Sequence, residues 1–145
     1  MRVIIQDKDY EVKVKYTAFM LFYEVEIVAD NNERMGKINF KIGKKENSNE
    51  TWIYNISTEQ KYQHIGVGKT LLKICEYMTS RKGIKVIRGR FLPSNEYAKP
   101  LYEKNGYEIT KYKDEAFFCK KISIKKTQES VSKILLDDTV LNNIL

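Results

Sequence analysis

The sequence predicts a single α/β domain built on one mixed, mostly antiparallel sheet of about seven strands. The chain has 145 residues, of which 42% are hydrophobic, and this suits one domain with a substantial core. Apolar and polar residues alternate along much of the first half, which is the pattern of half-buried strands. In the second half, strand-like segments alternate with helix-like ones. We therefore expect an antiparallel front half joined to a parallel β-α-β crossover.

The first half predicts four strands and leaves little space for helices. The strands are Tyr10–Tyr16, Phe22–Ala29, Met35–Ile42 and Trp52–Thr58. In the first of these, Val12 and Val14 share one face of the strand, while Lys13 lies on the other. Asp30–Glu33 has the composition of a hairpin turn, and the polar stretch Gly43–Glu50 predicts a loop.

The second half predicts two helices and three more strands. They are a helix over Gly68–Arg81, a strand over Ile84–Leu92, a helix over Asn95–Lys104, and strands over Tyr107–Tyr112 and Ala116–Ile122. An apolar stripe with helical spacing runs from Leu71 to Met78 on the first helix, and Gly83 follows where a helix C-cap belongs. Because Pro100 cannot donate a backbone hydrogen bond, we expect regular helix in the second one only from about Ala98.

An approximate helical stripe also marks the C-terminal tail, which begins at Thr127. Its apolar residues are Val131, Ile134, Leu135, Leu141 and Leu145. We expect this tail, 127–145, to pack on the domain formed by residues 1–126 or to lie at a subunit contact. A homodimer is therefore one arrangement that the sequence allows.

The amino-acid composition restricts which kinds of partner the protein can bind. The chain has 26 Lys and Arg against 19 Asp and Glu, a net charge of +7, which favours an anionic partner such as nucleic acid, a membrane surface or a phosphorylated cofactor. Cys75 and Cys119 are too few for a disulfide scaffold and lack zinc-site spacing, so we expect buried thiols and no metal. The sequence shows neither a membrane-spanning run nor a signal-peptide pattern, so we expect a cytoplasmic protein without a membrane partner.

The segment Gln63–Thr70 lies between a predicted strand and the first predicted helix, and it contains two glycines. Glycines let the backbone approach an anion, and the start of a helix adds unpaired N–H groups and a positive dipole end. The segment therefore predicts a phosphate site. A P-loop fits poorly, because Gln63 stands where that motif has its first glycine and the run before Asp137 lies in the helix-like tail.

Two blocks of residues resemble the GNAT superfamily of N-acetyltransferases. Gln63–Gly68 is similar to the family's pyrophosphate motif, which has Gln or Arg, two variable residues, Gly, one variable residue, and Gly or Ala. Asn95–Tyr107 is similar to the family's signature N-x-x-A-x-x-L-Y-x-K-x-G-F/Y. His64 departs from the common form, which has a glycine there. The resemblance covers Trp52 to Ile122 and implies the GNAT fold, here with its N-terminal helices reduced or absent.

The resemblance implies that acetyl-CoA binds between two parallel strands that splay apart, here Trp52–Thr58 and Ile84–Leu92. The pantetheine amides would pair with the backbone of Ile56, Ser57 and Thr58. The pyrophosphate would be held by the N–H groups of Gln63, His64, Ile65, Gly66, Val67, Gly68 and Lys69. Between Glu59 and Arg90 lie eight Lys and Arg but only two Glu, so most of the positive charge falls in the predicted cofactor half.

The second helix is expected to supply the catalytic acid. Tyr102 stands at the family's position for the group that protonates the departing CoA thiolate, and a tyrosine hydroxyl is protonated at neutral pH. Asn95, two turns away on the same face, is expected to hydrogen-bond the cofactor or to cap the helix. His64 is interpreted as a loop or phosphate contact. The base that takes the proton of the amine is left open between water and four residues: Glu24, Glu26, Glu50 and Glu59.

The front half departs from the family, because only Thr17–Leu21 separates two strands where members usually have two helices that form much of the acceptor pocket. We therefore expect an open acceptor site, or one completed by the tail or another subunit. The predicted function is direct transfer of acetyl from acetyl-CoA to a primary amine: a protein or peptide lysine, an N-terminus, a polyamine or an aminoglycoside. Two alternatives remain, a basic nucleic-acid-binding module, which we do not favour, and an acyl-CoA sensor without turnover.

Overall fold

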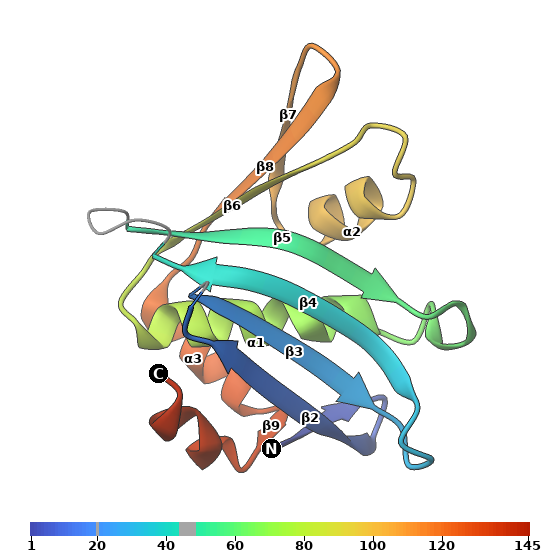
Figure 1. The fold of residues 1–145 in the computed structure, drawn as a ribbon, viewed down its shortest axis with the longest axis vertical. Coiled ribbons are helices and arrows are strands. Elements are labelled where there is room, and N and C mark those ends of the chain that lie inside the picture. The colour runs from blue at the N-terminus through green and yellow to red at the C-terminus, as the bar shows by residue number, and fades with distance from the viewer. Residues whose placement is uncertain (20, 44–48) are drawn as a thin grey trace.

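The computed structural model describes residues 1–19, 21–43 and 49–145, and within them nine strands form one sheet (Figure 1). Across this sheet the strands follow the order β7-β8-β6-β5-β4-β3-β2-β1-β9. Their bounds are β1 Arg2–Ile5, β2 Lys8–Thr17, β3 Phe22–Val28, β4 Arg34–Ile42, β5 Glu50–Thr58, β6 Val86–Phe91, β7 Glu108–Tyr112, β8 Glu115–Lys121 and β9 Leu135–Leu136. All described strand pairs are antiparallel except β5–β6, so the predicted mixed sheet is confirmed.

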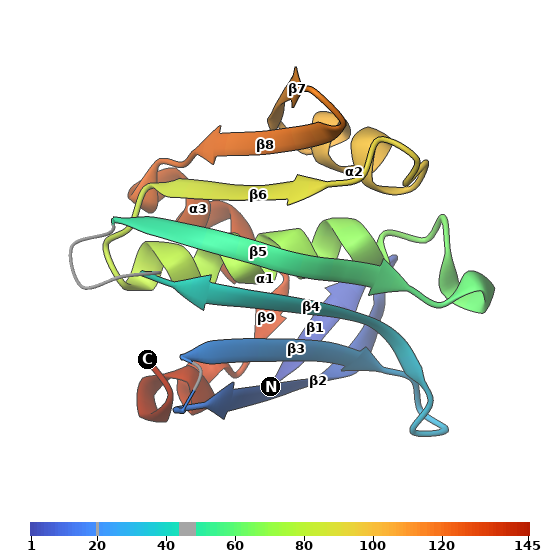
Figure 2. The same ribbon diagram turned by 45° about the horizontal axis from the view of Figure 1, so that its top comes forward.

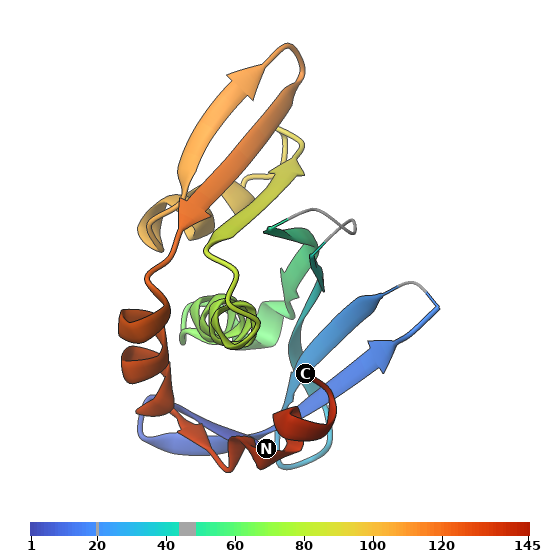
Figure 3. The same ribbon diagram turned by 90° about the vertical axis from the view of Figure 1, so that its left-hand side faces the viewer.

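Three α-helices lie on one side of this sheet (Figure 3). They are α1 Val67–Arg81, α2 Ala98–Lys104 and α3 Ile124–Ser132, and short 3-10 segments cover Gln60–Tyr62 and Asp138–Asn143. Helix α1 ends as its sequence predicts, because Gly83 adopts φ +74°, the left-handed conformation that commonly follows a helix.

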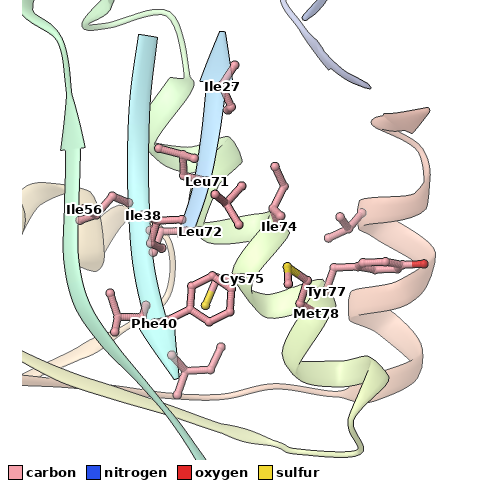
Figure 4. Packing of buried hydrophobic residues seen from close by; sticks show 14 of the residues in the cluster. Ile27, Ile38, Phe40, Ile56, Leu71, Leu72, Ile74, Cys75, Tyr77 and Met78 are labelled. Carbon is pink, nitrogen blue, oxygen red and sulfur yellow. The ribbon is translucent and has the colours of Figure 1, made fainter. Parts of the chain in front are cut away.

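The core lies between α1 and the central strands. Leu71, Ile74 and Met78 of α1 have no solvent-exposed surface, and Ile38 and Phe40 of β4 lie in the same cluster (Figure 4). Burying a large aliphatic or aromatic side chain stabilises a fold by about 1.5–3 kcal/mol, so this interface fixes α1 against the sheet. The helix therefore has a rigid base from which its N-terminus points beyond the end of β5 (Figure 2).

The parallel pair β5–β6 separates after a short ladder. It runs from Glu50 opposite Val86 to Ile53 opposite Gly89. Beyond that point β5 continues along β4, while β6 continues along β8, and the two strands diverge (Figure 2). We call the end of the ladder, at Ile53 and Gly89, the splay point. Within the part of the chain that the structure describes, no strand lies opposite the edge of β5 from there to Thr58 on the β6 side.

Two of the nine strands were not predicted. Strand β1 places Val3 opposite Tyr10 of β2, and β9 places Leu135 opposite Val3. They have four and two residues, which is too short for period-two alternation to be read from sequence. The sheet is therefore larger than predicted only at its outer edge.

The tail is less uniformly helical than its apolar stripe suggests. Helix α3 already begins at Ile124, where the Ser123 hydroxyl accepts a hydrogen bond from the backbone N–H of Lys126, so the boundary after residue 126 falls inside a helix. The chain then passes through β9 into the second 3-10 segment. Helix α3 lies beside α1, and its Val131 is buried (Figure 3).

The N-terminal helices of the family are absent from the described residues. Strand β2 ends at Thr17, and β3 begins at Phe22 after Leu21, which has φ +53°. In the described chain before α1, the only helical segment is the 3-10 turn Gln60–Tyr62. Most of the predicted loop Gly43–Glu50, residues 44–48, lies outside the described residues, and Glu50 itself begins β5. No helix in the described ranges is long and apolar enough to cross a membrane.

Candidate active site

A cavity of about 680 Å³ lies where β5 ends and where α1 and α2 begin. We call it the cleft. Seven of the eleven predicted cofactor-binding residues line it: Thr58, Gln63, His64, Gly66, Val67, Gly68 and Lys69. The opposite wall comes from α2 and its flanks: Glu96, Tyr97, Pro100, Leu101, Lys104 and Asn105. The structure thus brings the two sequence blocks together at one site.

The turn before α1 has a backbone that suits an anion. Gly66 caps the helix with φ +103°, and His64 has φ +67°, both in the left-handed region that favours glycine. This explains why the family commonly has glycine at the position of His64. The first turn of α1 contains no acidic residue, and its N–H groups have no partner within the helix. Together with the helix dipole, these groups make a cradle that fits a pyrophosphate.

Gly68 allows a close contact between α1 and α2. A Cβ atom at this position would lie 2.6 Å from the Tyr97 hydroxyl oxygen and 3.1 Å from Cδ1 of Leu101. The same Tyr97 hydroxyl is 2.7 Å from Oγ1 of Thr58. Tyr97 therefore reaches from α2 to both other walls of the cleft, and its partial burial raises the pKa of its hydroxyl.

Tyr97 was missed by sequence reasoning, although it stands inside the second motif block. It follows Asn95 by two residues and directly precedes the first residue of α2. A sequence shows neither the 2.7 Å hydrogen bond to Thr58 nor the approach to Gly68, because these contacts depend on the packing of α2 against α1. The only available signal was an aromatic residue at the start of a predicted helix beside a predicted phosphate site.

Tyr102 lies in an aromatic cluster and is not among the residues that line the cleft. Only 3% of its surface is exposed, and its ring stacks on Phe118 with 3.8 Å between the centroids. Phe118 in turn covers Gly89, where an added Cβ atom would meet the ring at 2.1 Å. Tyr102 is thus held beside the splay point. Burial raises the pKa of its hydroxyl well above the ordinary value, so the group keeps its proton at neutral pH.

The remaining predicted contacts lie next to the cleft. Ile56 is 8% exposed and belongs to the core cluster, and neither Ser57 nor Ile65 lines the cavity. Asn95 caps α2, because its Oδ1 accepts hydrogen bonds of 3.2 Å from the backbone N–H groups of Tyr97 and Ala98. Any contact of these residues with a cofactor stays a prediction.

Pro100 has a simple place in α2. The helix begins at Ala98, so Pro100 is its third residue, where the backbone N–H of any residue would have no partner within the helix. The expected start of regular helix at Ala98 is confirmed, and Pro100 costs the helix no hydrogen bond. Its ring forms part of the cleft wall.

All four glutamates considered as bases are ion-paired. Glu24 lies 3.4 Å from Lys37, and Glu50 lies 2.8 Å from Arg88. Glu26 and Glu59 share Arg34, at 3.6 Å and 3.2 Å. The pairing gives no reason to prefer one of them, so the base stays open. In the described ranges no group of three or more His, Cys, Asp or Glu residues could hold a metal ion.

Residues 21–109 match the family model described as an acetyltransferase (GNAT) domain. This segment is more than half of the chain, and it contains both motif blocks and the cleft walls. The chain belongs to this family. The resemblance seen in the sequence is thereby confirmed, as is its class of enzyme, the acetyl-CoA-dependent acetyltransferases.

Solved structures show that the GNAT fold extends over most of the chain. The PaiA N-acetyltransferase from Thermoplasma acidophilum in complex with coenzyme A is 24% identical, with a TM-score of 0.62, and the match covers 70% of this chain and 61% of that one. The GNAT domain of S. lividans PAT is 11% identical, with a TM-score of 0.72, and the match covers 84% and 96%. A GNAT family acetyltransferase from Listeria monocytogenes is 9% identical, with a TM-score of 0.63, and the match covers 84% and 100%.

At these levels of sequence identity, the similarity to solved structures establishes the fold alone. A search of curated proteins gives no match. The GNAT domain described here spans 61% of the length of the Thermoplasma protein, so the reaction of the whole protein is a matter for proposal.

Proposed function

We propose that this GNAT domain transfers acetyl from acetyl-CoA directly to a primary amine, and that the amine belongs to a peptide or protein. The observation that carries the proposal is that the cradle at Gly66–Lys69 shares one cavity with Thr58, the last residue of β5, whose unpaired edge runs back to the splay point. A long, thin molecule with an anionic end and a reactive end fits such a path.

Different groups of the chain bind different parts of acetyl-CoA along this path. The N–H groups at the start of α1 and the ammonium of Lys69 bind the pyrophosphate. The edge of β5 from Tyr54 to Thr58 pairs with amide groups of the pantetheine arm, as an added strand would. When bound, acetyl-CoA supplies the activated acetyl group close to Gly89 and the Tyr102 ring.

In the transfer step a carbon–nitrogen bond replaces a carbon–sulfur bond. The amine nitrogen forms a bond to the acetyl carbon, and the bond from that carbon to sulfur breaks. A proton leaves the nitrogen for a base or water, and the departing thiolate takes a proton from the hydroxyl of Tyr102. A cysteine carrier in the core is disfavoured, because Cys75 is fully buried and burial raises the pKa of its thiol.

The sheet face away from the helices supports a peptide or protein as the acceptor. Its side chains include Phe22, whose ring lies 5.5 Å from that of Tyr54, and Trp52, whose ring lies 6.4 Å from that of Tyr54. The ammonium of Lys41 lies 5.7 Å from the centre of the Tyr54 ring, and this cation–π contact supports the choice of an aromatic surface as the place where an acceptor amine binds. Because the face is open, it can accept a long chain more readily than it can enclose a small amine.

The experiment is a continuous assay of CoA release with acetyl-CoA and a panel of amines. Lysine peptides, peptides with a free N-terminus, polyamines and aminoglycosides form the panel. We expect turnover with at least one peptide class, and turnover with polyamines or aminoglycosides alone would overturn the choice of acceptor. Acetyl-CoA binding without turnover would support a sensor. Salt-sensitive binding of oligonucleotides without affinity for acetyl-CoA would support a nucleic-acid module.

A further inference from the structure

A second cavity, of about 360 Å³, adjoins the cleft between α1, the end of α2, β8 and α3. We call it the lysine cavity. Its charged lining residues are five lysines and one glutamate: Lys69, Lys73, Lys104, Lys120, Lys126 and Glu76. Lys69, Lys104 and Asn105 line both cavities, so the two share a rim. The elements that surround the lysine cavity lie together in Figures 1 and 3.

The single glutamate of this cavity is fully engaged. Glu76 is buried, and its carboxylate accepts hydrogen bonds from Lys120 at 2.8 Å and from the Tyr107 hydroxyl at 3.1 Å. Lys120 also donates to the backbone oxygen of Asn105 at 2.9 Å, which ties β8 to the end of α2. These contacts build a fixed floor for the cavity.

The other four lysines have no such partner. Within the described residues, no carboxylate lies within ion-pair distance of Lys69, Lys73, Lys104 or Lys126. Like charges held around one cavity repel one another, and a bound dianion would remove that repulsion. The cavity therefore has the charge of a site for a phosphate group.

The spacing along α1 points to the source of that phosphate. Lys69 and Lys73 are four residues apart, so they share a face and stand about 6 Å apart along the helix axis. Lys69 belongs to the cradle for the pyrophosphate, and Lys73 lies one turn further on. In coenzyme A the 3′-phosphate is separated from the pyrophosphate by a single ribose, which is a comparable distance.

We infer that the lysine cavity binds the 3′-phosphate of acetyl-CoA, and that Lys73, Lys104 and Lys126 make the domain selective for CoA over its 3′-dephospho form. This inference rests on the proposed function. Lys126 comes from α3, which lies outside the matched segment 21–109. The C-terminal helix therefore completes the cofactor site as well as packing on α1.

Calorimetry with CoA and 3′-dephospho-CoA tests the inference. Because a hydrogen bond to a charged group is worth roughly tenfold or more in affinity, we expect the wild-type protein to bind CoA at least tenfold more tightly than 3′-dephospho-CoA. Lys73→Gln, Lys104→Gln and Lys126→Gln should each reduce this ratio. Lys73 and Lys126 do not line the cleft, so their two variants should leave the Kd of 3′-dephospho-CoA nearly unchanged. Lys73→Arg should keep most of the ratio.

Lys99→Gln is the matched control. Lys99 is an exposed lysine on α2 that faces Glu103 at 3.9 Å and does not line either cavity. It should leave both affinities unchanged. Circular dichroism melting curves of all variants should coincide with that of the wild type, since Lys99, Lys104 and Lys126 are exposed and Lys73 is only half-buried.

Three results separate the outcomes. Equal affinity of the wild-type protein for CoA and 3′-dephospho-CoA overturns the inference and leaves the proposed function intact. Adenosine 3′,5′-bisphosphate that binds without competing with CoA overturns it as well, because the cavity then holds a separate phosphate ligand. If the protein binds neither CoA nor its dephospho form, the proposed function itself fails.

Discussion

Two tyrosines, Tyr97 just before α2 and Tyr102 within it, stand in different surroundings. The Tyr97 hydroxyl bonds to Thr58 in the cleft and occupies the space that a Cβ atom on Gly68 would need, whereas the Tyr102 ring is stacked on Phe118 beside the splay point. Burial raises the pKa of both hydroxyls, so both are protonated at neutral pH. Their positions along the path of the cofactor, rather than their protonation, therefore distinguish a binding residue from an acid.

Tyr102→Phe should lower kcat by roughly 10²–10⁴-fold and leave the Kd of acetyl-CoA almost unchanged, because the ring stays packed and only the proton is lost. The measurement is CoA release under conditions in which chemistry limits the rate. Tyr107→Phe is a matched control, since its ring lies 5.4 Å from that of Tyr102 and its hydroxyl bonds to Glu76. An unchanged kcat in Tyr102→Phe would remove Tyr102 as the acid.

Tyr97→Phe should have the opposite effect. Without the hydrogen bond to Thr58 the wall of the cleft is less well ordered, so the Kd of acetyl-CoA should rise by about fivefold while kcat changes little. Calorimetry and steady-state kinetics on the same preparation measure both quantities. A fall in kcat at constant Kd would instead assign the acid role to Tyr97.

His64→Gly should stabilise the domain. His64 has φ +67°, a conformation that costs an L-residue about 1–2 kcal/mol, and glycine avoids this strain at a smaller entropic cost. We expect the free energy of unfolding in urea to increase by about 0.5–1 kcal/mol. His64→Ala removes the imidazole but keeps the strain, so a gain of the same size there would contradict the backbone explanation.

At the scale of elements, sequence patterns predicted every part that has a strong local signal. The seven longer strands, α1 and α2 follow from alternation, helical spacing and turn residues. Strands β1 and β9 are too short for a pattern: β1 pairs with its neighbour β2, and β9 forms because Leu135 reaches Val3 from the other end of the chain. Long-range pairing of this kind leaves no local trace.

The candidate site was predictable to a similar degree. The cradle before α1 is a local feature, so five of the six residues of the motif Gln63–Gly68 line the cleft. The wall formed by α2, the burial of Tyr102 and the lysine cavity depend on how helices pack, and sequence spacing does not determine that. The ion pairs of the four glutamates also depend on strand register, which explains why no spacing selected one of them.

Gly66→Ala tests the cradle as an element. Gly66 has φ +103°, and an added Cβ atom would meet only Cγ2 of Ile5, at an ordinary contact distance of 3.7 Å, so an alanine there is strained and shifts the turn without a clash. We expect the affinity for acetyl-CoA to fall by roughly tenfold or more, since several backbone hydrogen bonds to one anion depend on this turn. Calorimetry on the folded variant measures the loss.

Gly83→Ala is the control for that experiment. Gly83 has φ +74°, no atom lies within 4 Å of the added Cβ position, and the residue lies at the other end of α1. Both variants should lose about 1–2 kcal/mol of stability, as expected for an L-residue in the left-handed region. Only Gly66→Ala should weaken acetyl-CoA binding, and equal binding in the two variants would argue against the pyrophosphate cradle.

At the scale of the whole molecule, the two ends of the chain close the outer edge of the sheet. The Tyr23 hydroxyl donates a hydrogen bond of 3.4 Å to the backbone oxygen of Ile144, and Leu141 is completely buried in the core cluster. The C-terminal residues thus belong to the core of the domain, although they lie outside the family match.

Leu141→Ala should therefore lower the free energy of unfolding by about 2–5 kcal/mol, the usual effect of removing a buried leucine side chain. Leu136→Ala, at a leucine that is 39% exposed, should cost much less. Urea denaturation of both variants gives the comparison. Similar small losses in the two variants would show that the C-terminal segment is not tied to the core.

The short β5–β6 ladder has a mechanical consequence. Among the described residues, the four pairs of the β5–β6 ladder join the strands β1 to β5 and β9 to the strands β6 to β8, so the sheet narrows there between two parts (Figure 2). A ligand that lies along β5 and also contacts α2 holds these two parts in a fixed position relative to each other. At a concentration one hundred times its Kd such a ligand adds about 2.7 kcal/mol to stability. Amide hydrogen exchange should therefore show the largest gain in protection along the β5–β6 ladder, where the two parts could otherwise move relative to each other.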